Sequence, residues 1–226
     1  MEWTTVPSDV EFLIETEHFA SGGFRKAFKA KSLTKCYMDK TWVVKHYLEK
    51  ALQDIEATGQ TPEEHTRKVV QGHTLAMNFA KQLKERVIQE HLDVEYGPVF
   101  EYRKIFMGKT DIDEFVTVEE YIEGKFVKYI NNNGQLCGED SEVRKKAESL
   151  AHFSYEKSKG RLMLLDIQGS GHTLYDPEFA SRQIMDDAGN VQFCTGNLSM
   201  VAIDNFFSEH SCNNFCTILN LKVQSK

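Results

Sequence analysis

One long helix constrains the fold of this chain more than any other feature of its sequence. Thr61 can cap the helix, Pro62 suits its first position, and Glu64 completes a capping box. Apolar residues then recur at helical spacing over about seven turns, namely Val69, Ala76, Phe79, Ala80, Leu83 and Val87. A helix of this length with a single apolar stripe needs a broad apolar surface to pack against.

The strands that would provide this surface lie on both sides of the helix in the sequence. Alternating or apolar, β-branched runs predict strands over residues 24–30, 41–47, 96–107, 115–122 and 162–167. Further helices are expected from a cap at Ser141 to a terminating Gly160, and over residues 200–207. The chain is therefore predicted to be an α+β protein.

No repeat or flexible linker divides the chain, but its character changes near residues 122–125. Acidic residues and Gly124 end the strand at this point, and the tract Asn131-Asn132-Asn133-Gly134 predicts a turn soon after it. We expect one domain of two lobes, with an N-terminal lobe over about residues 1–118, a hinge over about 119–124 and a C-terminal lobe over about 125–226.

The composition is that of a globular protein, with 41% hydrophobic and 27% charged residues among 226. Lys and Arg total 27 against 34 Asp and Glu, so the net charge of −7 gives no general attraction to nucleic acid or to an anionic membrane. No apolar run approaches the about 18–20 residues that span a bilayer, and the first residues lack the pattern of a secretory signal. We expect a cytoplasmic protein without nucleic-acid partners or membrane insertion.

The cysteines point to a metal site near the C-terminus. There are five, mostly far apart, which favours free thiols or a metal site over a disulfide framework. His210, Cys212 and Cys216 lie close together in sequence, and on a helix the two thiols would face the same side. A fourth ligand from elsewhere, for which we favour His152, would complete a tetrahedral zinc site. The alternative is two buried thiols and an unrelated surface histidine.

Carboxylates that could bind a metal or accept a proton lie at and after the end of the last predicted strand. On a strand, Asp166 and Gln168 would face the same side, where their oxygens can share Mg²⁺. They can also simply hydrogen-bond the loop that follows. Asp176 precedes Pro177, which favours an extended backbone at Asp176. Its carboxylate then suits a base or an orienting group, although many Asp-Pro pairs are only turns.

The first lobe offers candidates for a phosphate site. Gly22 and Gly23 precede a strand and would let backbone N–H groups approach phosphate oxygens, to which Arg25 can add a bidentate contact. Lys45 lies in an apolar strand, where an interior lysine needs a carboxylate or a bound phosphate, whereas an ordinary strand lysine faces solvent. Taken with the carboxylates, these residues offer every part that phosphoryl transfer from ATP requires.

Several segments, in this order, resemble the atypical alpha-kinases, the group of myosin heavy chain kinases and elongation-factor kinases. They span residues 22–216 and read SGGFRKAFKA, WVVKHY, VEEYIEGKFVKYINNNG, AHFSYEKSKGRLMLLDIQG, YDP, GNLS and HSCNNFC. Within the group the chain looks most similar to the von Willebrand factor-associated and myosin heavy chain kinase branch. The HRD and DFG motifs of typical protein kinases are absent from the sequence.

The resemblance implies a two-lobed kinase fold that holds ATP between its lobes and carries a structural zinc site in the C-terminal lobe. Lys45 matches the lysine that contacts the ATP phosphates, and the glycine loop is matched by Gly22, Gly23 and Arg25. The segment joining the lobes, whose backbone would meet the adenine, is matched by Glu119, Glu120 and Tyr121.

The same resemblance implies roles for the polar residues of the C-terminal lobe. Asp166 and Gln168 match the metal-ligating pair for Mg²⁺, and Asp176 matches the catalytic aspartate. The structural zinc ligands are matched by His152, His210, Cys212 and Cys216. The family's glycine-rich motif usually reads Asn-Leu-Gly, whereas here Ser199 follows Leu198, and Tyr175 stands where Thr is common.

The function that the resemblance implies is an ATP- and Mg²⁺-dependent protein serine/threonine kinase, whose partners are ATP and a protein hydroxyl. Because the catalytic set is intact, we expect an active enzyme. The main alternative is a zinc-stabilised nucleotide-binding pseudokinase or scaffold module. A kinase that acts on a small molecule is the third hypothesis.

Overall fold

The computed structural model describes residues 7–185, 189, 192–194 and 196–223. Contacts divide the chain into two compact units. The first contains the residues up to Gln71 together with Lys104–Ile122, and the second contains Gly72–Arg103 together with the residues from Glu123 onward. The chain passes from the first unit to the second inside helix α2 (Pro62–Gln89).

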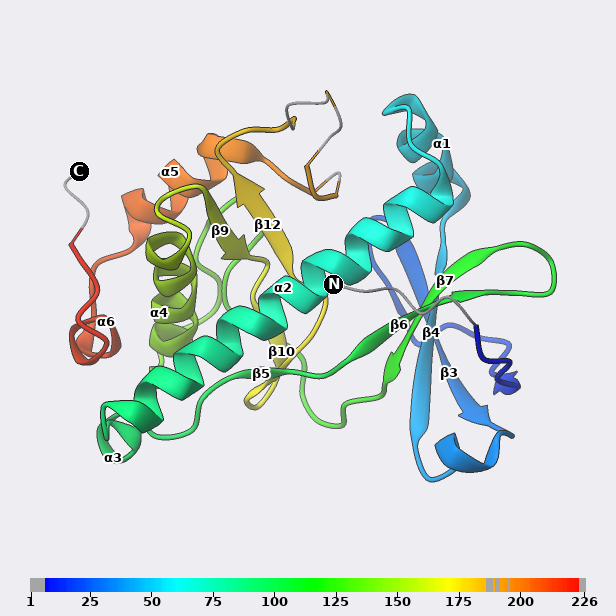
Figure 1. The fold of residues 1–226 in the computed structure, drawn as a ribbon, viewed down its shortest axis with the longest axis horizontal. Coiled ribbons are helices and arrows are strands. Elements are labelled where there is room, and N and C mark those ends of the chain that lie inside the picture. Colours follow the sequence, from blue (N-terminus) through cyan, green and yellow to red (C-terminus); the bar gives the residue numbers. More distant parts are fainter. Residues whose placement is uncertain (1–6, 186–188, 190–191, 195, 224–226) are drawn as a thin grey trace. The chain divides into compact units, whose positions relative to one another are not determined.

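The first unit is built on a six-stranded antiparallel sheet (Figure 1). Its strands follow the order β1-β3-β4-β7-β6, and β2 also pairs with β3. Their bounds are β1 (Phe12–Ile14), β2 (Ala20–Ser21), β3 (Arg25–Ser32), β4 (Thr41–Tyr47), β6 (Ile105–Lys109) and β7 (Phe115–Glu120), with the short helices η1 (Lys35–Tyr37) and α1 (Glu49–Ala57). The strands predicted over residues 24–30, 41–47 and 115–122 are confirmed, with small shifts at their ends.

The register of this sheet gives it two chemically different faces. Ala30 lies opposite Trp42 and Val44 lies opposite Val118, so a buried apolar cluster occupies one face, consisting of Ala30, Trp42, Val44, Val116 and Val118. Because side chains alternate with a period of two, the other face carries Arg25, Lys45, Thr117 and Glu119. Strand register thus gathers polar residues that are far apart in sequence.

The second unit contains a four-stranded sheet of order β5-β11-β10-β8 and a separate antiparallel pair, β12-β9. The strands are β5 (Glu101–Tyr102), β8 (Val127–Lys128), β9 (Leu162–Leu165), β10 (Gln168–Ser170), β11 (Thr173–Leu174) and β12 (Glu178–Ser181). The helices, besides the larger part of α2, are α3 (Asp93–Tyr96), α4 (Glu142–Lys157), α5 (Ser199–Glu209) and α6 (Asn214–Ile218).

The strand predicted over residues 96–107 is wrong. Helix α3 ends at Tyr96, and β5 and β6 are separate strands that belong to different units. The backbone of Gly97 has a positive φ of 66°, and Pro98 has no N–H to donate, so a continuous strand cannot pass through these two residues.

Helices cover the core of the second unit. Helix α4 begins at its predicted cap, where the Ser141 side chain accepts from the Arg144 N–H, and it packs against β9 and α6 (Figure 1). The predicted apolar stripe of α2 joins this core at Ala76, Phe79, Ala80, Leu83 and Val87. Nearer the start of α2, Val70 is buried and Val69 is only half-buried, so the predicted stripe was wrong at that residue.

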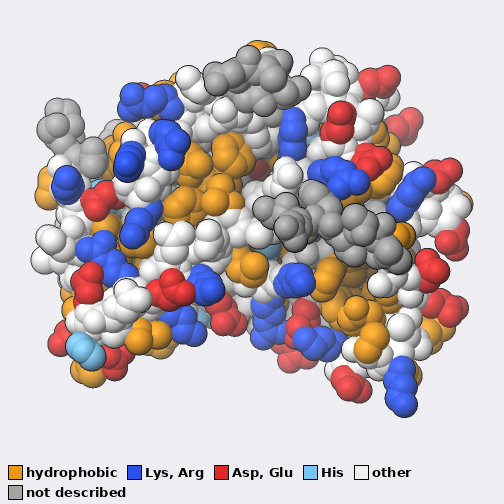
Figure 2. Space-filling model, in the orientation of Figure 1, with side chains coloured by type: hydrophobic (Ala, Val, Ile, Leu, Met, Phe, Trp, Pro, Cys, Tyr) orange, Lys and Arg blue, Asp and Glu red, His pale blue; other side chains and the backbone are white. Residues whose placement is uncertain are grey.

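The surface shows no dominant charge in the view of Figure 2, where Lys and Arg side chains alternate with Asp and Glu. This mixture agrees with a net charge of only −7 on the whole chain. Within the residues that the structure describes, no helix is both long enough and apolar enough to cross a membrane.

A glycine turn is packed tightly against α5. The Gly134 N–H donates to the Asn131 carbonyl oxygen at 3.1 Å, which confirms the turn predicted there. Gly134 has a φ of 86°, and a Cβ at this position would overlap the Ala202 carbonyl oxygen and lie 2.8 Å from the Phe206 nitrogen. Glycine is therefore required here both by the backbone conformation and by the contact with α5.

We predict that Gly134→Ala lowers the free energy of unfolding by about 2–4 kcal/mol, because left-handed strain and steric overlap add together. Gly171→Ala is the matched control, since Gly171 has a φ of 58° but a Cβ added there would meet nothing within 4 Å. Gly171→Ala should lower the free energy of unfolding only by the left-handed backbone strain, about 1 kcal/mol. Urea unfolding of both variants measures the difference, and equal losses would show that the contact with α5 contributes nothing.

Candidate functional site

In the first unit, Lys45 is buried and paired with a carboxylate. Its ammonium lies 2.6 Å from Glu119 Oε1, and each side chain is only about a tenth exposed. Lys45 is on β4 and Glu119 on the neighbouring strand β7, on the same face of the sheet. The prediction that Lys45 faces the interior and needs an anion is therefore confirmed, and the solvent-facing alternative is wrong. Sequence reasoning considered only the backbone of Glu119 and missed its side chain.

The glycine turn before β3 leaves its backbone uncovered. The Gly22 N–H donates to the Arg25 carbonyl oxygen at 2.9 Å, and a side chain at Gly23 would meet nothing within 4 Å. Arg25 itself is held on the polar face of the sheet, where its guanidinium donates to Thr117 Oγ1 at 3.0 Å. Packing does not require either glycine, so the absence of side chains here leaves room for a ligand beside the backbone.

A buried histidine supports this turn from one side. The ring of Phe24 stacks on that of His65 at a centroid distance of 6.1 Å. His65 Nδ1 lies 2.9 Å from the Tyr47 hydroxyl, while its Nε2 is buried and finds no hydrogen-bond partner among the residues that the structure describes. Burial, with smaller contributions from the charges of Arg25 and Lys68, lowers the pKa of His65 to about 4. The turn therefore rests on an imidazole that is neutral at ordinary pH.

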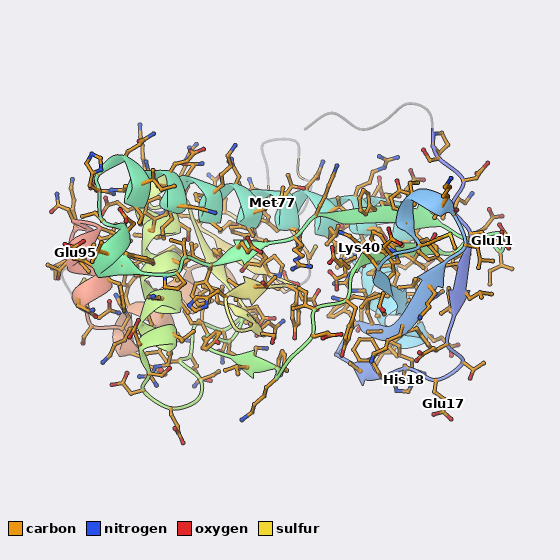
Figure 3. The ribbon with its side chains drawn as sticks, turned by 90° about the horizontal axis from the view of Figure 1, so that it is seen from below. Glu11, Glu17, His18, Lys40, Met77 and Glu95 are labelled. Atoms are coloured by element: carbon orange, nitrogen blue, oxygen red, sulfur yellow. The ribbon has the colours of Figure 1, made fainter. Side chains whose placement is uncertain are left out.

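The end of β7 carries the remaining first-unit candidates. The carboxylate of Glu120 lies 2.6 Å from the ammonium of Lys40, a residue labelled in Figure 3. The Tyr121 N–H donates to the Thr41 carbonyl oxygen at 2.8 Å. The Tyr121 ring lies under the Lys29 ammonium, 4.3 Å from the ring centroid, and edge-on to Phe19. This segment therefore offers an aromatic surface in addition to its backbone.

In the second unit, the three candidate residues Asp166, Gln168 and Asp176 lie together. The Gln168 amide donates to Asp166 Oδ2 at 3.1 Å and to the Asp176 carbonyl oxygen at 3.2 Å. Strand alternation is not the reason, because β9 ends at Leu165 and Asp166 lies between strands with a φ of 50°. Asp176 has a φ of 56°, so the extended backbone predicted for it was wrong. Left-handed backbone at two non-glycine residues is typical of functional sites.

A lysine that sequence reasoning missed completes this group. Lys128 Nζ lies 2.7 Å from Asp166 Oδ1, and Lys128 on β8 is in register with Gln168 on β10. Burial raises the pKa of Asp166, and the charge of Asp176 adds to this, while Lys128 acts in the opposite direction. Only the pairing of β8 with β10, which no local sequence pattern reveals, brings Lys128 to Asp166.

The four cysteine and histidine candidates form one compact group. The ligand atoms of His152, His210, Cys212 and Cys216 all lie within 4.8 Å of one another. Cys212 precedes α6, so a shared helix is not the reason for their approach. The turn is instead held by Asn213, whose side chain accepts from the Phe215 and Cys216 N–H groups. Since His210 is buried and Cys212 is exposed, the alternative of buried thiols with an unrelated surface histidine does not describe this group.

Hydrogen bonds orient the imidazole rings of His152 and His210, so that one nitrogen lone pair of each ring faces the cysteines of the group. His152 Nε2 lies 3.0 Å from the Lys222 carbonyl oxygen, and His210 Nδ1 lies 2.8 Å from Glu148 Oε2. Each of these nitrogens therefore carries the proton, and the other nitrogen faces a thiol. Burial lowers the pKa of His152, and it raises the pKa of the Cys216 thiol to about 12. The imidazole nitrogen that faces a thiol can bind a metal in each case, whereas the Cys216 thiol would ionise only beside a cation.

Ser199 occupies a backbone conformation that favours glycine. It has a φ of 55°, and its N–H donates to Asn197 Oδ1 at 3.0 Å. Asn197 also accepts from the Ser181 N–H, which ties the loop to the end of β12. The resembled family usually has glycine at this position. Ser199 therefore adopts a backbone conformation that is strained for a residue with a side chain. The other departure, Tyr175, packs its ring on Phe126 at 6.2 Å.

Comparison with known proteins identifies the family. The alpha-kinase family matches residues 20–216, so this chain belongs to the alpha-kinase family. Myosin heavy chain kinase B of Dictyostelium discoideum is 28% identical over 221 residues, covering 98% of this chain. Human eukaryotic elongation factor 2 kinase is 27% identical over 226 residues, covering 97%. The chain spans only 27% and 28% of the lengths of these two proteins.

The fold is also that of a solved alpha-kinase domain. The alpha-kinase domain of myosin heavy chain kinase A in complex with ADP superposes with a TM-score of 0.77. This likeness covers 96% of the present chain and 90% of the other at 20% identity. The same domain is also known in complex with adenosine, with a TM-score of 0.75.

We predict that His65 makes the protein sensitive to acid. Its folded pKa of about 4 lies below that of an unfolded histidine, about 6.5, so its contribution is complete above pH 6.5 and is lost as the pH falls toward 4. The free energy of unfolding therefore falls by about 3 kcal/mol across this pH range. His65→Gln should lose less stability than the wild type between about pH 7.5 and pH 4.5. His18→Gln, at an exposed histidine labelled in Figure 3, should behave as the wild type in urea titrations. If His65→Gln kept the full acid sensitivity, another group would be responsible.

Proposed function

We propose that this chain is the catalytic domain of an ATP- and Mg²⁺-dependent protein kinase that transfers the γ-phosphate of ATP to Ser or Thr hydroxyls. One observation carries the proposal: in a chain of the alpha-kinase family, a buried lysine–carboxylate pair and a group of two aspartates with a glutamine both form. Membership of the family, with relatives named as protein kinases and a similar domain crystallised with ADP, supports it.

The first-unit residues are proposed to bind the nucleotide. Lys45 contacts the phosphates, and its pairing with Glu119 holds the ammonium in place, because a buried lysine has few other acceptors. The exposed backbone at Gly23 approaches phosphate oxygens, while the Gly22 N–H holds the turn through its bond to the Arg25 carbonyl oxygen, and Arg25 adds a guanidinium. Glu120 and Tyr121 belong to the segment proposed to meet the adenine.

The second-unit residues are proposed to bind the metal and orient the acceptor. Asp166 and Gln168 provide oxygen ligands for Mg²⁺, an ion that neutralises charge developing on the phosphates when it is bound. Asp176 orients the acceptor hydroxyl or takes its proton.

We predict that the wild type transfers labelled γ-phosphate from Mg·ATP to itself or to a generic protein acceptor, and that Asp176→Ala and Asp166→Ala each lower the rate by at least about 100-fold. The variant at a metal ligand should regain part of its rate at high Mg²⁺, whereas the variant at the proton acceptor should not. Full transfer by Asp176→Ala with an intact fold would contradict its role. ATP binding without any transfer by the wild type would favour the nucleotide-binding scaffold instead.

We also propose that the group formed by His152, His210, Cys212 and Cys216 holds one structural zinc ion. A tetrahedral zinc with bonds of about 2.3 Å to sulfur and about 2.0 Å to nitrogen keeps these atoms about 3.5 Å apart. The two thiol–imidazole distances, 3.7 Å for Cys212 to His152 and 3.6 Å for Cys216 to His210, support this fit. The ion would link α4, which carries His152, to the segment after α5.

We predict about one zinc per chain in the purified protein. Cys216→Ser should remove the metal and lower the Tm by about 10 °C or more, because metal binding contributes directly to folding. Cys137→Ser, at a half-buried thiol outside the group, should leave both zinc content and Tm unchanged. Elemental analysis and thermal unfolding measure these outcomes, and a metal-free wild type that unfolds cooperatively at the same Tm would refute the structural zinc.

Finally, we propose that the two units work as one catalytic domain over residues 1–226 and that the protein acts in the cytoplasm. The predicted division, with one continuous N-terminal lobe over about residues 1–118, differs from the two units, because Gly72–Arg103 belongs to the second unit. The family match across residues 20–216 covers parts of both units and supports the first point. The odd and sparse set of five cysteines, which does not suggest a disulfide framework, supports the second.

A further inference from the structure

A buried carboxylate of α4 lies beside the His and Cys group. Glu148 is only 4% exposed, and its Oε2 lies 2.8 Å from Nδ1 of His210, which is itself 5% exposed. Glutamate is rarely buried in folded proteins, because removing its charge from water costs free energy unless that charge is compensated. Packing alone would favour an apolar residue at this position, so the carboxylate is expected to have another role.

The charge of Glu148 is balanced by one arginine. Arg144 lies one turn earlier on α4, and its Nε is 3.3 Å from Glu148 Oε1. The rest of the guanidinium bonds to the turn before the helix, where Nη1 donates to the Gly138 carbonyl oxygen and Nη2 donates to Asp140 Oδ1. One oxygen of Glu148 thus faces a cation, and the other faces a proposed zinc ligand. Two roles follow for this carboxylate, an ion pair within the helix or support of His210.

The two histidines of the group are oriented by acceptors of different kinds. His152 Nε2 faces a neutral acceptor, the backbone carbonyl oxygen of Lys222, at 3.0 Å. His210 Nδ1 instead faces a carboxylate, and a hydrogen bond to an ionised acceptor is about twice as strong as one between neutral groups. A carboxylate that accepts from one ring nitrogen also makes the other nitrogen a more basic metal ligand. His210 is therefore expected to be the stronger of the two imidazole ligands.

Helix α4 brings the carboxylate to the group by its own periodicity. Glu148 lies four residues before His152, so the two side chains lie on the same face of the helix. The helix also holds the segment that carries the two thiols, because the Asn213 side chain donates to the Lys145 carbonyl oxygen at 3.0 Å. Helix α4 thus provides one proposed ligand, His152, and supports a second ligand that comes from a distant segment.

We propose that Glu148 is a positioning residue of the His and Cys group, whose negative charge, acting through His210, strengthens zinc binding by about 10-fold or more. This inference rests on the proposed function, because it takes His152, His210, Cys212 and Cys216 as zinc ligands. An imidazole that binds a cation gives electron density to it, so its N–H becomes a better donor. The bond from His210 to Glu148 would therefore be stronger with the metal than without it, and this difference favours the bound state.

The experiment measures two properties of the purified chain. The first is the zinc dissociation constant, obtained by competition with a chelator of known affinity, and the second is the Tm of the metal-free protein. In Glu148→Gln the amide oxygen can accept the same hydrogen bond without a negative charge. We expect the zinc dissociation constant of this variant to rise about 10-fold or more. An unchanged dissociation constant would overturn the inference.

Arg144→Gln is the matched control, because it breaks the same ion pair and leaves the bond between Glu148 and His210 in place. It leaves a buried carboxylate without this cation, so the metal-free Tm should fall at least as far as in Glu148→Gln. The zinc dissociation constant of Arg144→Gln should nevertheless stay close to that of the wild type. If both variants weaken zinc binding equally, Glu148 serves only the stability of α4, and the inference is wrong.

A third variant separates this inference from the proposed zinc site. Cys216→Ser removes a proposed ligand and should weaken zinc binding more than Glu148→Gln does. If Cys216→Ser loses the metal while Glu148→Gln binds it as tightly as the wild type, only the role of Glu148 is refuted. If the wild type itself binds no zinc, the site is wrongly assigned, and the role of Glu148 falls with it.

Discussion

The first unit depends on the register of its antiparallel sheet. Pairing of β3, β4 and β7 places the apolar cluster on one face and Arg25, Lys45, Thr117 and Glu119 on the other. A slip of one residue would move every side chain of a strand to the opposite face. It would bury the charged residues in the cluster and expose Trp42 and Val44. The hydrophobic cluster therefore also fixes the position of the proposed phosphate-binding lysine, since both follow from the same pairing.

Local patterns predicted the elements well where one face of an element is buried. The α2 stripe, the Ser141 cap and the strands around Arg25 and Lys45 follow from periodicity and capping, which are properties of neighbouring residues. The strand expected over residues 96–107 failed because Gly97 and Pro98 interrupt a run that is apolar on average. How the short strands β5, β8, β10 and β11 pair is set by contacts between distant segments, and no local pattern determines it.

The candidate site could be predicted by residue type more fully than by geometry. The residues chosen in the second unit do lie together. His152, the fourth member of the His and Cys group, was favoured from the sequence and agrees with the family resemblance, which supplied the roles. Three partners were missed, namely the Glu119 side chain, Lys128 and Glu148. Each makes its contact across a strand pair or between distant segments, and each is an ordinary charged residue in sequence. The left-handed backbone at Asp166 and Asp176 could not be predicted from the sequence either, because tertiary contacts impose it.

The ion pair between Lys128 and Asp166 has a consequence for how a cation would enter this part of the molecule. Without a metal, the ammonium already serves as an internal counter-ion, which limits the repulsion between Asp166 and the nearby charge of Asp176. A divalent ion that bound at Asp166 would therefore compete with a tethered cation rather than meet a bare carboxylate. Its binding would be an exchange, and the released ammonium, on a side chain that is about one-third exposed, would become available to another anion. A phosphate that arrives with the ion would be such an anion, so the same step that admits the metal would provide a positive charge for its companion.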